Sequence, residues 1–155
     1  MNKSIDPGMH TAEHILNGTM DQLFNCGRCF SAHIERKKSK CDYHFNRSLS
    51  SEELTKIESR INRIISSNMK VADTYITKTE AEKQFNLSRL PEGSSTKIRI
   101  VSVGDYDACP CIGPHVAETS EIGIFRITTS DFKDGIRDFH VTGVQTCALP
   151  ILCRP

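Results

Sequence analysis

Two pairs of side chains in this sequence have the types and the spacing of metal ligands. His10 and His14 stand four residues apart in a segment with helical periodicity, so both imidazoles fall on one helix face, one turn apart. Much further along the chain, Cys111 and His115 flank a Gly-Pro turn, which can bring a thiolate and an imidazole together. Three imidazoles and one thiolate suit Zn²⁺, a borderline-soft ion with no geometric preference of its own. The sequence therefore predicts a zinc site made of these four residues.

The cysteine content favours the same chemistry. The chain has seven cysteines in 155 residues, and its N-terminus lacks the apolar segment of a secretory signal. Clustered Cys and His then indicate metal ligation rather than disulfides. Cys26 and Cys29 form one C-x-x-C, a spacing of redox motifs and zinc ribbons, but no second C-x-x-C follows. We therefore expect Cys26 to end a helix, Cys29 to face the core, and Cys109 to lie near the site as a spare ligand.

The first histidine pair encloses an acidic residue. The segment HTAEH matches H-x-x-E-H, the inverted zincin signature in which the glutamate is a general base. Enzymes of that class are much larger and take a third ligand from a distant acidic residue, whereas this chain offers a cysteine and a histidine. We expect Glu13 at the helix surface or behind the ligands, and a peptidase is a minor alternative.

Length and composition predict one ordinary domain. The 155 residues are 37% hydrophobic and 25% charged, which is typical of a soluble globular protein with a single core. No apolar run approaches the length needed to cross a bilayer, so we expect a cytoplasmic protein with no membrane partner. A net charge of +1 does not fit a protein that coats nucleic acid nonspecifically, although a local basic patch can still bind tRNA.

Periodicity and capping signals predict a mixture of helices and strands. Ser50 with Glu53 and Thr77 with Glu80 form capping boxes at two helix starts. We expect helices over 8–24, 51–68 and 78–85, strands over 29–35, 40–45, 69–76, 97–103 and 122–129, and a turn-rich segment over 104–115. Because the elements lack a regular βαβ rhythm, the predicted fold is a single α+β domain with a mostly antiparallel sheet packed by helices. The zinc site would lie between the N-terminal helix and the late Cys/His turn.

Two motifs carry a resemblance to a known family. HTAEHIL at 10–16 and CIGPHVAETSEIG at 111–123 resemble the alanyl-tRNA editing domain, which also occurs as free-standing AlaX-type proteins and, more distantly, as the second additional domain of threonyl-tRNA synthetase. The family pattern is HxxxH, then Cys-Gly-Gly-Thr-His-Val followed by Thr, then Glu-Ile-Gly. The four predicted ligands fall on its metal positions, and Thr119 and 121–123 fall on its trailing motif. One departure is Ile112-Gly113-Pro114 in place of Gly-Gly-Thr, which removes a hydroxyl near the metal and stiffens the turn.

The resemblance implies a zinc-dependent hydrolase that deacylates mischarged tRNA, with seryl- or glycyl-tRNA of the alanine acceptor as the suggested substrates. Because nine residues precede His10, with no room for an adenylation domain, it implies action in trans. Zinc can polarise the ester carbonyl, lower the pKa of a water or hold the substrate's amino group. Four protein ligands are typical of a closed structural site, whereas catalytic zinc keeps a position open. The catalytic group is therefore left open between a zinc-activated water and three side chains: Glu13, Ser31 and His33.

Polar side chains outside the ligand set have open roles. Ser31 and His33 can either line the pocket and recognise a seryl hydroxyl or lie on a solvent face. Two basic groups can either meet tRNA phosphates or simply be solvated. They are Arg36, Lys37 and Lys38 in a turn, and Lys56, Arg60 and Arg63 on one helix face. The rival functions are a non-catalytic, zinc-stabilised tRNA-binding module and a zinc hydrolase with another substrate.

The C-terminal segment departs from the family pattern. Residues 134–137 resemble the start of the family's last strand, but VTGVQTCALPIL at 141–152 does not continue it and resembles translated sequencing-adapter sequence. We therefore expect an editing domain over 1–140 and a non-native or disordered tail over 141–155, with no role for Cys147 and Cys153. The sequence predicts no oligomeric state.

Overall fold

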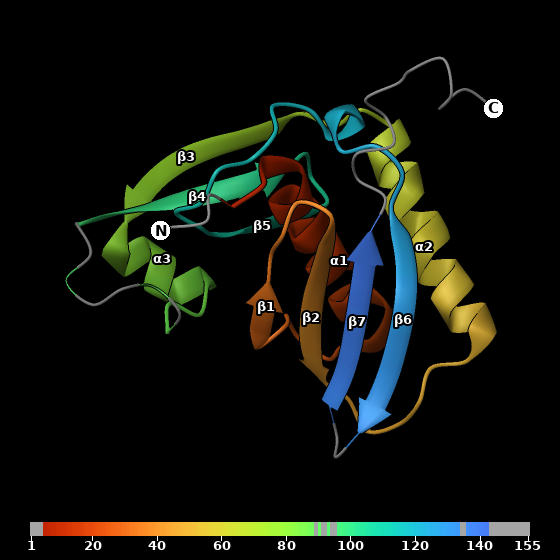
Figure 1. The fold of residues 1–155 in the computed structure, drawn as a ribbon. Helices are drawn as coiled ribbons and strands as arrows, with labels where there is room; N and C mark the ends of the chain where they lie inside the picture. The colour runs from red at the N-terminus through yellow and green to blue at the C-terminus, as the bar shows by residue number, and fades with distance from the viewer. Residues whose placement is uncertain (1–4, 89, 91–92, 94–95, 134–135, 143–155) are drawn as a thin grey trace.

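The long N-terminal helix is buried by the rest of the chain. In the computed structural model, which describes residues 5–88, 90, 93, 96–133 and 136–142, helix α1 (Pro7–Phe24) lies behind a four-stranded sheet (Figure 1). Nearly every residue from Gly8 to Met20 is buried. A helix that is covered all round belongs to the core, and its polar side chains must find partners inside the protein.

Two antiparallel sheets and two further helices surround α1. The larger sheet has the order β1 (Ser31–His33), β2 (Lys38–His44), β7 (Ile136–Thr142), β6 (Arg126–Lys133). The smaller sheet has the order β3 (Val71–Thr77), β4 (Lys97–Val103), β5 (Asp107–Pro110). Helix α2 (Ser51–Ser66) runs beside β6, and the short helix α3 (Lys78–Gln84) lies by the smaller sheet (Figure 1). The predicted α+β class is confirmed, with two antiparallel sheets where the sequence suggested one.

The main core forms where the apolar faces of these elements meet. Strand β2 alternates between exposed and buried residues, with Cys41 and Tyr43 facing inward. Helix α2 buries Ile57, Ile61, Ile64 and Ile65, and both predicted capping boxes are present. The fully buried side chains of this core include Met9, Ile15, Leu16, Met20, Tyr43, Ile57, Ile61, Ile122 and Phe125. A second, smaller core lies under α3.

Three local expectations differ from the structure. The turn-rich segment contains β5, a four-residue strand whose sequence DACP carries no strand signal. Strand β6 begins at Arg126 instead of residue 122, because a short 3₁₀ helix (Thr119–Glu121) first turns Ile122 and Phe125 into the core. Strand β7 runs to Thr142, two residues into the expected tail, and the rest of that tail lies outside the described residues.

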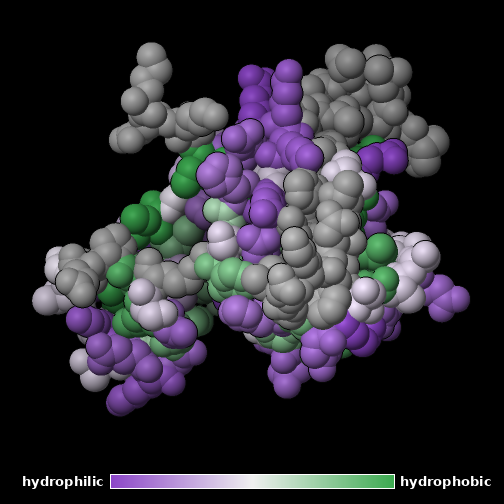
Figure 2. All heavy atoms as spheres, turned by 60° about the horizontal axis from the view of Figure 1, so that its bottom comes forward, coloured by the Kyte–Doolittle hydropathy of each residue, from purple (hydrophilic) through white to green (hydrophobic). Residues whose placement is uncertain are grey.

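The visible surface is mostly polar. Figure 2 shows hydrophilic side chains over much of one face, with hydrophobic side chains in small groups. The large hydrophobic side chains that are exposed within the described part of the chain are Ile5, Phe30, Tyr75 and Ile112. No helix in that part is long and apolar enough to cross a membrane.

A buried hydrogen-bond network ties α1 to the larger sheet. The Asn17 side-chain oxygen accepts from the Tyr43 hydroxyl at 2.6 Å and from the Cys29 backbone N–H at 2.9 Å. The Asn17 amide donates to Glu13 Oε1 at 2.8 Å, and the Cys29 thiol donates to the same oxygen at 3.2 Å. Cys29 therefore lies in the core, as expected, and half-buried Cys26 follows the end of α1. Asn17 makes three of these four hydrogen bonds and is therefore the centre of the network.

We expect substitutions in this network to lower the free energy of unfolding, and the loss should be larger at Asn17 than at Tyr43. Tyr43→Phe removes one buried hydrogen bond and should lower the free energy of unfolding by about 1 kcal/mol. Asn17→Ala leaves the Cys29 N–H and the Tyr43 hydroxyl without their acceptor and should cost about 3 kcal/mol. Urea unfolding measures both changes. Tyr75→Phe, which removes the same hydroxyl from an exposed ring, is the control, and an equal effect at positions 43 and 75 would contradict the network.

Candidate metal centre

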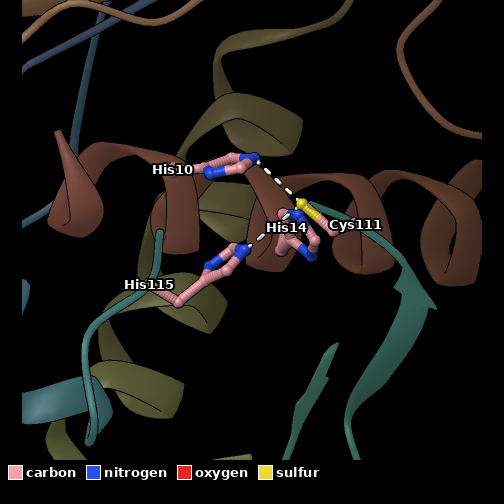
Figure 3. Close-up of side chains that lie close together, drawn as sticks. All are labelled: His10, His14, Cys111 and His115. Carbon is pink, nitrogen blue, oxygen red and sulfur yellow. Dashed lines mark hydrogen bonds between the residues drawn. The ribbon is translucent and has the colours of Figure 1, made fainter. Parts of the chain in front are cut away.

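The structure brings the four predicted ligands together. His10 and His14 project from the first turns of α1, and Cys111 and His115 lie in the loop that follows β5 (Figure 3). One potential ligand atom from each residue lies within 4.8 Å of the other three. The Cys111 sulfur is 3.4 Å from Nε2 of His10 and 3.4 Å from Nε2 of His115. These donors converge on one point and could hold a single ion.

Arg99 of β4 fixes the loop that carries Cys111. Its Nη1 donates to the backbone oxygens of Cys111, at 3.2 Å, and Gly113, at 2.7 Å. Its Nε donates to the Asp73 carboxylate on β3 at 2.8 Å, so the guanidinium links two strands to the loop. The Cys111 N–H in turn donates to the Arg99 carbonyl at 3.2 Å. The loop that carries the thiol is therefore tied to the central strand of the smaller sheet.

Gly113 allows the His10 ring to lie against the loop. A side-chain carbon added at Gly113 would lie 2.6 Å from Nδ1 of His10 and would also collide with the neighbouring ring carbon. Both contacts would be shorter than any non-bonded contact that such a carbon makes in proteins. Only glycine leaves room for the imidazole in this position.

Hydrogen bonds to the outer ring nitrogens select the tautomers of two histidines. Nδ1 of His10 lies 3.1 Å from the Pro114 carbonyl, which can only accept, so this nitrogen carries the proton. The Thr11 hydroxyl donates to the Pro7 carbonyl at 2.9 Å, and its oxygen therefore accepts from Nδ1 of His115 at 2.9 Å. In both rings the lone pair on Nε2 then faces Cys111. Such contacts around ligating histidines orient the ring and tune the metal.

Burial keeps the three imidazoles neutral. Loss of solvent lowers the pKa of His14 well below its usual value, and the nearby His115 lowers it further. Burial first, and then the charge of His10, lower the pKa of His115 to about 3. Burial likewise lowers the pKa of His10 and raises that of the Cys111 thiol. Neutral imidazoles with aimed lone pairs are what a cation needs, and a bound cation reverses the effect of burial on a thiol. The donor set therefore fits Zn²⁺.

The other predicted residues occupy different environments. Glu13 is buried beside the centre, with Oε2 3.8 Å from Nε2 of His14, so it lies behind the ligands and the helix-surface alternative is wrong. The Cys109 sulfur lies 3.2 Å from Nδ1 of His14, close to the centre as expected. Ser31 and His33 are exposed on β1, on the sheet face opposite the inward-facing Cys41. The structure does not bring these two side chains to the four ligands.

Four residues that shape the centre were not predicted. Thr11 and Arg99 act as described, and Arg28 forms a two-pronged ion pair with Asp107, at 2.7 and 3.2 Å, next to His14. Desolvation and the Arg28 guanidinium act in opposite directions on the pKa of Asp107, and desolvation, which raises it, is the larger. The only sequence signal for any of them was the threonine within HTAEH, since the others depend on contacts between distant segments.

Comparison with known proteins shows which proteins this chain is similar to. The second additional domain of threonyl and alanyl tRNA synthetases matches residues 98–138, which include Cys111 and His115. The alanine–tRNA ligase of Staphylothermus marinus is 35% identical over 132 residues, which are 82% of this chain and 14% of that protein. The alanine–tRNA ligase of Nitrosomonas eutropha is 30% identical over 130 residues, 83% of this chain and 15% of that protein. This chain is related to the second additional domain of threonyl and alanyl tRNA synthetases.

The relationship extends beyond the matched segment of the second additional domain. A ligase from Rickettsia massiliae aligns at 29% identity over 136 residues, again 83% of this chain. The chain spans only about 15% of the length of these ligases. The similarity is therefore to one segment of much larger proteins, and it covers most of the fold described here.

The contact between Gly113 and His10 makes a specific prediction. Gly113→Ala should displace the imidazole and weaken the binding of a divalent ion at least about tenfold, the scale of effects from residues around metal ligands. Competition with a chromophoric zinc chelator measures the affinity. The neighbouring Ile112→Ala, which shortens an exposed side chain, should leave the affinity unchanged. Equal affinities for Gly113→Ala and the parent protein would contradict the role of this glycine.

The Thr11 hydroxyl supports a second prediction. Thr11→Val keeps the size of the side chain but leaves Nδ1 of His115 without its acceptor, so the ring can adopt the other tautomer or rotate. We expect the affinity for Zn²⁺ to fall by about 10- to 100-fold. Thr11→Ser, which restores the hydroxyl, should recover most of the affinity in the same assay. Failure of serine to do better than valine would show that the methyl group, and not the hydrogen bond, matters.

Proposed function

We propose that this chain is a zinc-dependent deacylase that hydrolyses the ester of a mischarged aminoacyl-tRNA. The observation that supports this most strongly is the convergence of His10, His14, Cys111 and His115 from two distant segments. Its relatives over more than four fifths of its length are alanine–tRNA ligases, which supports a tRNA ester as the substrate. The candidate substrates are seryl- and glycyl-tRNA of the alanine acceptor, since small residues are hard for a synthetase to reject by binding alone.

The chain's own residues would hold and orient the reacting groups. When bound, Zn²⁺ supplies a Lewis acid for the ester carbonyl. Thr11 and the Pro114 carbonyl keep two imidazole lone pairs aimed inward, and Gly113 lets one ring approach. His14 is buried at the back of the centre, whereas the other three ligands are partly exposed. The partly exposed ligands mark the side from which an ester would approach the centre.

Glu13 is the best placed of the proposed catalytic side chains. Its Oε1 is fixed by Asn17 and Cys29, while Oε2 points to the His14 side of the centre. We propose that Glu13 positions His14 and supplies negative charge beside the ion. For Ser31 and His33, which lie exposed on the outer face of β1, we propose contact with bound tRNA instead of a role in hydroxyl recognition.

Basic side chains on the surface would meet the tRNA. Arg36, Lys37 and Lys38 are exposed at the turn between β1 and β2. On α2, Lys56 and Arg63 are exposed, whereas Arg60 is half-buried and lies 3.5 Å from Gln22. Phosphate contacts of this kind position a nucleic acid without reading its sequence. We propose that the reaction takes place in the cytoplasm, on tRNA charged by another protein.

One observation favours a second function. A centre with four protein donors is typical of structural zinc, so a non-catalytic tRNA-binding module fits the same ligands. The two functions differ in whether the ester is broken after the tRNA binds.

Deacylation of alanine tRNA charged with serine tests the proposal. The zinc-loaded protein should release serine, and Cys111→Ala or His115→Ala should lower the rate at least about a hundredfold, because a Lewis acid is worth several kcal/mol in the transition state. Release of labelled serine measures the rate, and gel shift measures tRNA binding separately. Cys26→Ala, which removes a thiol at the end of α1, serves as the control that leaves the ligands intact.

The outcomes separate the two functions. Binding of the charged tRNA without release of serine or glycine would overturn the deacylase and support the binding module. A rate that survives Cys111→Ala and a chelator would overturn the dependence on zinc.

A further inference from the structure

A second set of metal-binding side chains lies beside the first and shares His14 with it. Cys109 Sγ and Asp107 Oδ2 lie 3.2 and 3.8 Å from Nδ1 of His14, and one potential ligand atom from each residue lies within 4.8 Å of the others. These side chains are hidden from solvent, with exposed fractions of 3% for His14 and 6% for Asp107 and 8% for the whole Cys109 residue. Imidazole, carboxylate and thiolate are all zinc ligands. We propose that His14, Asp107 and Cys109 form an alternative position for a divalent ion.

The two positions exclude each other. A neutral imidazole has one nitrogen with a free lone pair, so His14 can serve one ion at a time. The protein would therefore bind a single ion, either at the four-ligand set of His10, His14, Cys111 and His115 or at the three-ligand set proposed here. An ion that moves from the first set to the second gives up His10, Cys111 and His115, gains Asp107 and Cys109, and keeps His14 as the shared ligand.

The second set has three protein donors instead of four. Zinc with four protein donors is closed, whereas zinc with three protein donors keeps a position for another group. Movement from the first set to the second would therefore convert a closed ion into an open one. This resolves the conflict between a closed ligand set and a hydrolytic function.

The surroundings of Asp107 support a ligating role. Arg28 donates to both of its carboxylate oxygens, at 2.7 and 3.2 Å. A carboxylate offers about four lone-pair sites, so Oδ2 can accept from Arg28 and still ligate an ion, and ligating carboxylates are commonly hydrogen-bonded in this way. Gly18 of α1 makes space for the carboxylate, since a side-chain carbon there would lie 3.1 Å from Oδ1. Glycine is unfavourable within a helix, and here it lets Asp107 approach.

A variant without the first set tests the proposal directly. In His10→Ala/Cys111→Ala/His115→Ala, only the second set remains. Titration with Co²⁺ should show one bound equivalent, with a thiolate-to-cobalt absorption band contributed by Cys109 and a Kd raised at least about tenfold over the parent protein. Adding Cys109→Ser should abolish the band, and adding Asp107→Asn should weaken binding by a further factor of about ten. Cys26→Ser, in the same background, removes a thiol elsewhere and should change neither.

Two results would overturn the alternative position. One is a triple variant that is folded by circular dichroism and binds Co²⁺ without the thiolate band. The other is a band that survives Cys109→Ser. If the triple variant does not fold, the double variant His10→Ala/Cys111→Ala is titrated with Co²⁺ instead, and the same two results would overturn the proposal. The inference rests on the proposed function only in assigning a divalent ion to the chain, and a protein that binds Co²⁺ as expected but releases no amino acid would leave it standing.

Discussion

The burial of α1 is the constraint on which the rest of the structure depends. A helix covered by two sheets and a second helix cannot leave polar side chains to water, yet α1 carries Thr11, Glu13, His14 and Asn17 among its buried residues. Each has hydrogen-bond partners inside the protein. Asn17 binds the larger sheet, and Thr11 binds His115 of the late loop. The candidate metal centre is thus the point where a polar stripe of the core helix meets the end of the smaller sheet.

The same burial determines the charge balance of the centre. Three imidazoles stay neutral because solvent is excluded from them, and the pKa of the Cys111 thiol is raised for the same reason. Arg28 and Asp107 form an ion pair, and the Glu13 carboxyl group is buried beside His14. Neutral imidazoles with a carboxyl group close by are compatible with a cation among these donors.

Local patterns predicted most of the elements and the four converging residues. The helical spacing of His10 and His14, the capping box at Ser50 and the apolar alternation of β4 are properties of short segments, and they were sufficient. Strand β5 was missed because it is held by pairing with β4 and not by its own composition. The ion pair of Arg28 and Asp107 could not be predicted for a similar reason, because two residues 79 positions apart produce no periodic pattern in the sequence. The exposure of Ser31 and His33 likewise depends on which face of the sheet meets α1.

The departure from the family pattern at residues 112–114 does not change the geometry of the candidate metal centre. Of Ile112-Gly113-Pro114, the glycine is the residue against which the His10 ring lies, and the proline contributes a backbone carbonyl that any residue would offer. The lost hydroxyl is not needed to orient His115, because Thr11 on the helix does so. What differs is the Ile112 side chain, which is 74% exposed next to a ligand. A change that leaves the ligands in place but puts an apolar side chain on the surface beside them acts on what can approach the centre. In the deacylase that we propose, the turn would therefore act on substrate selection, while metal binding would depend on the residues around it.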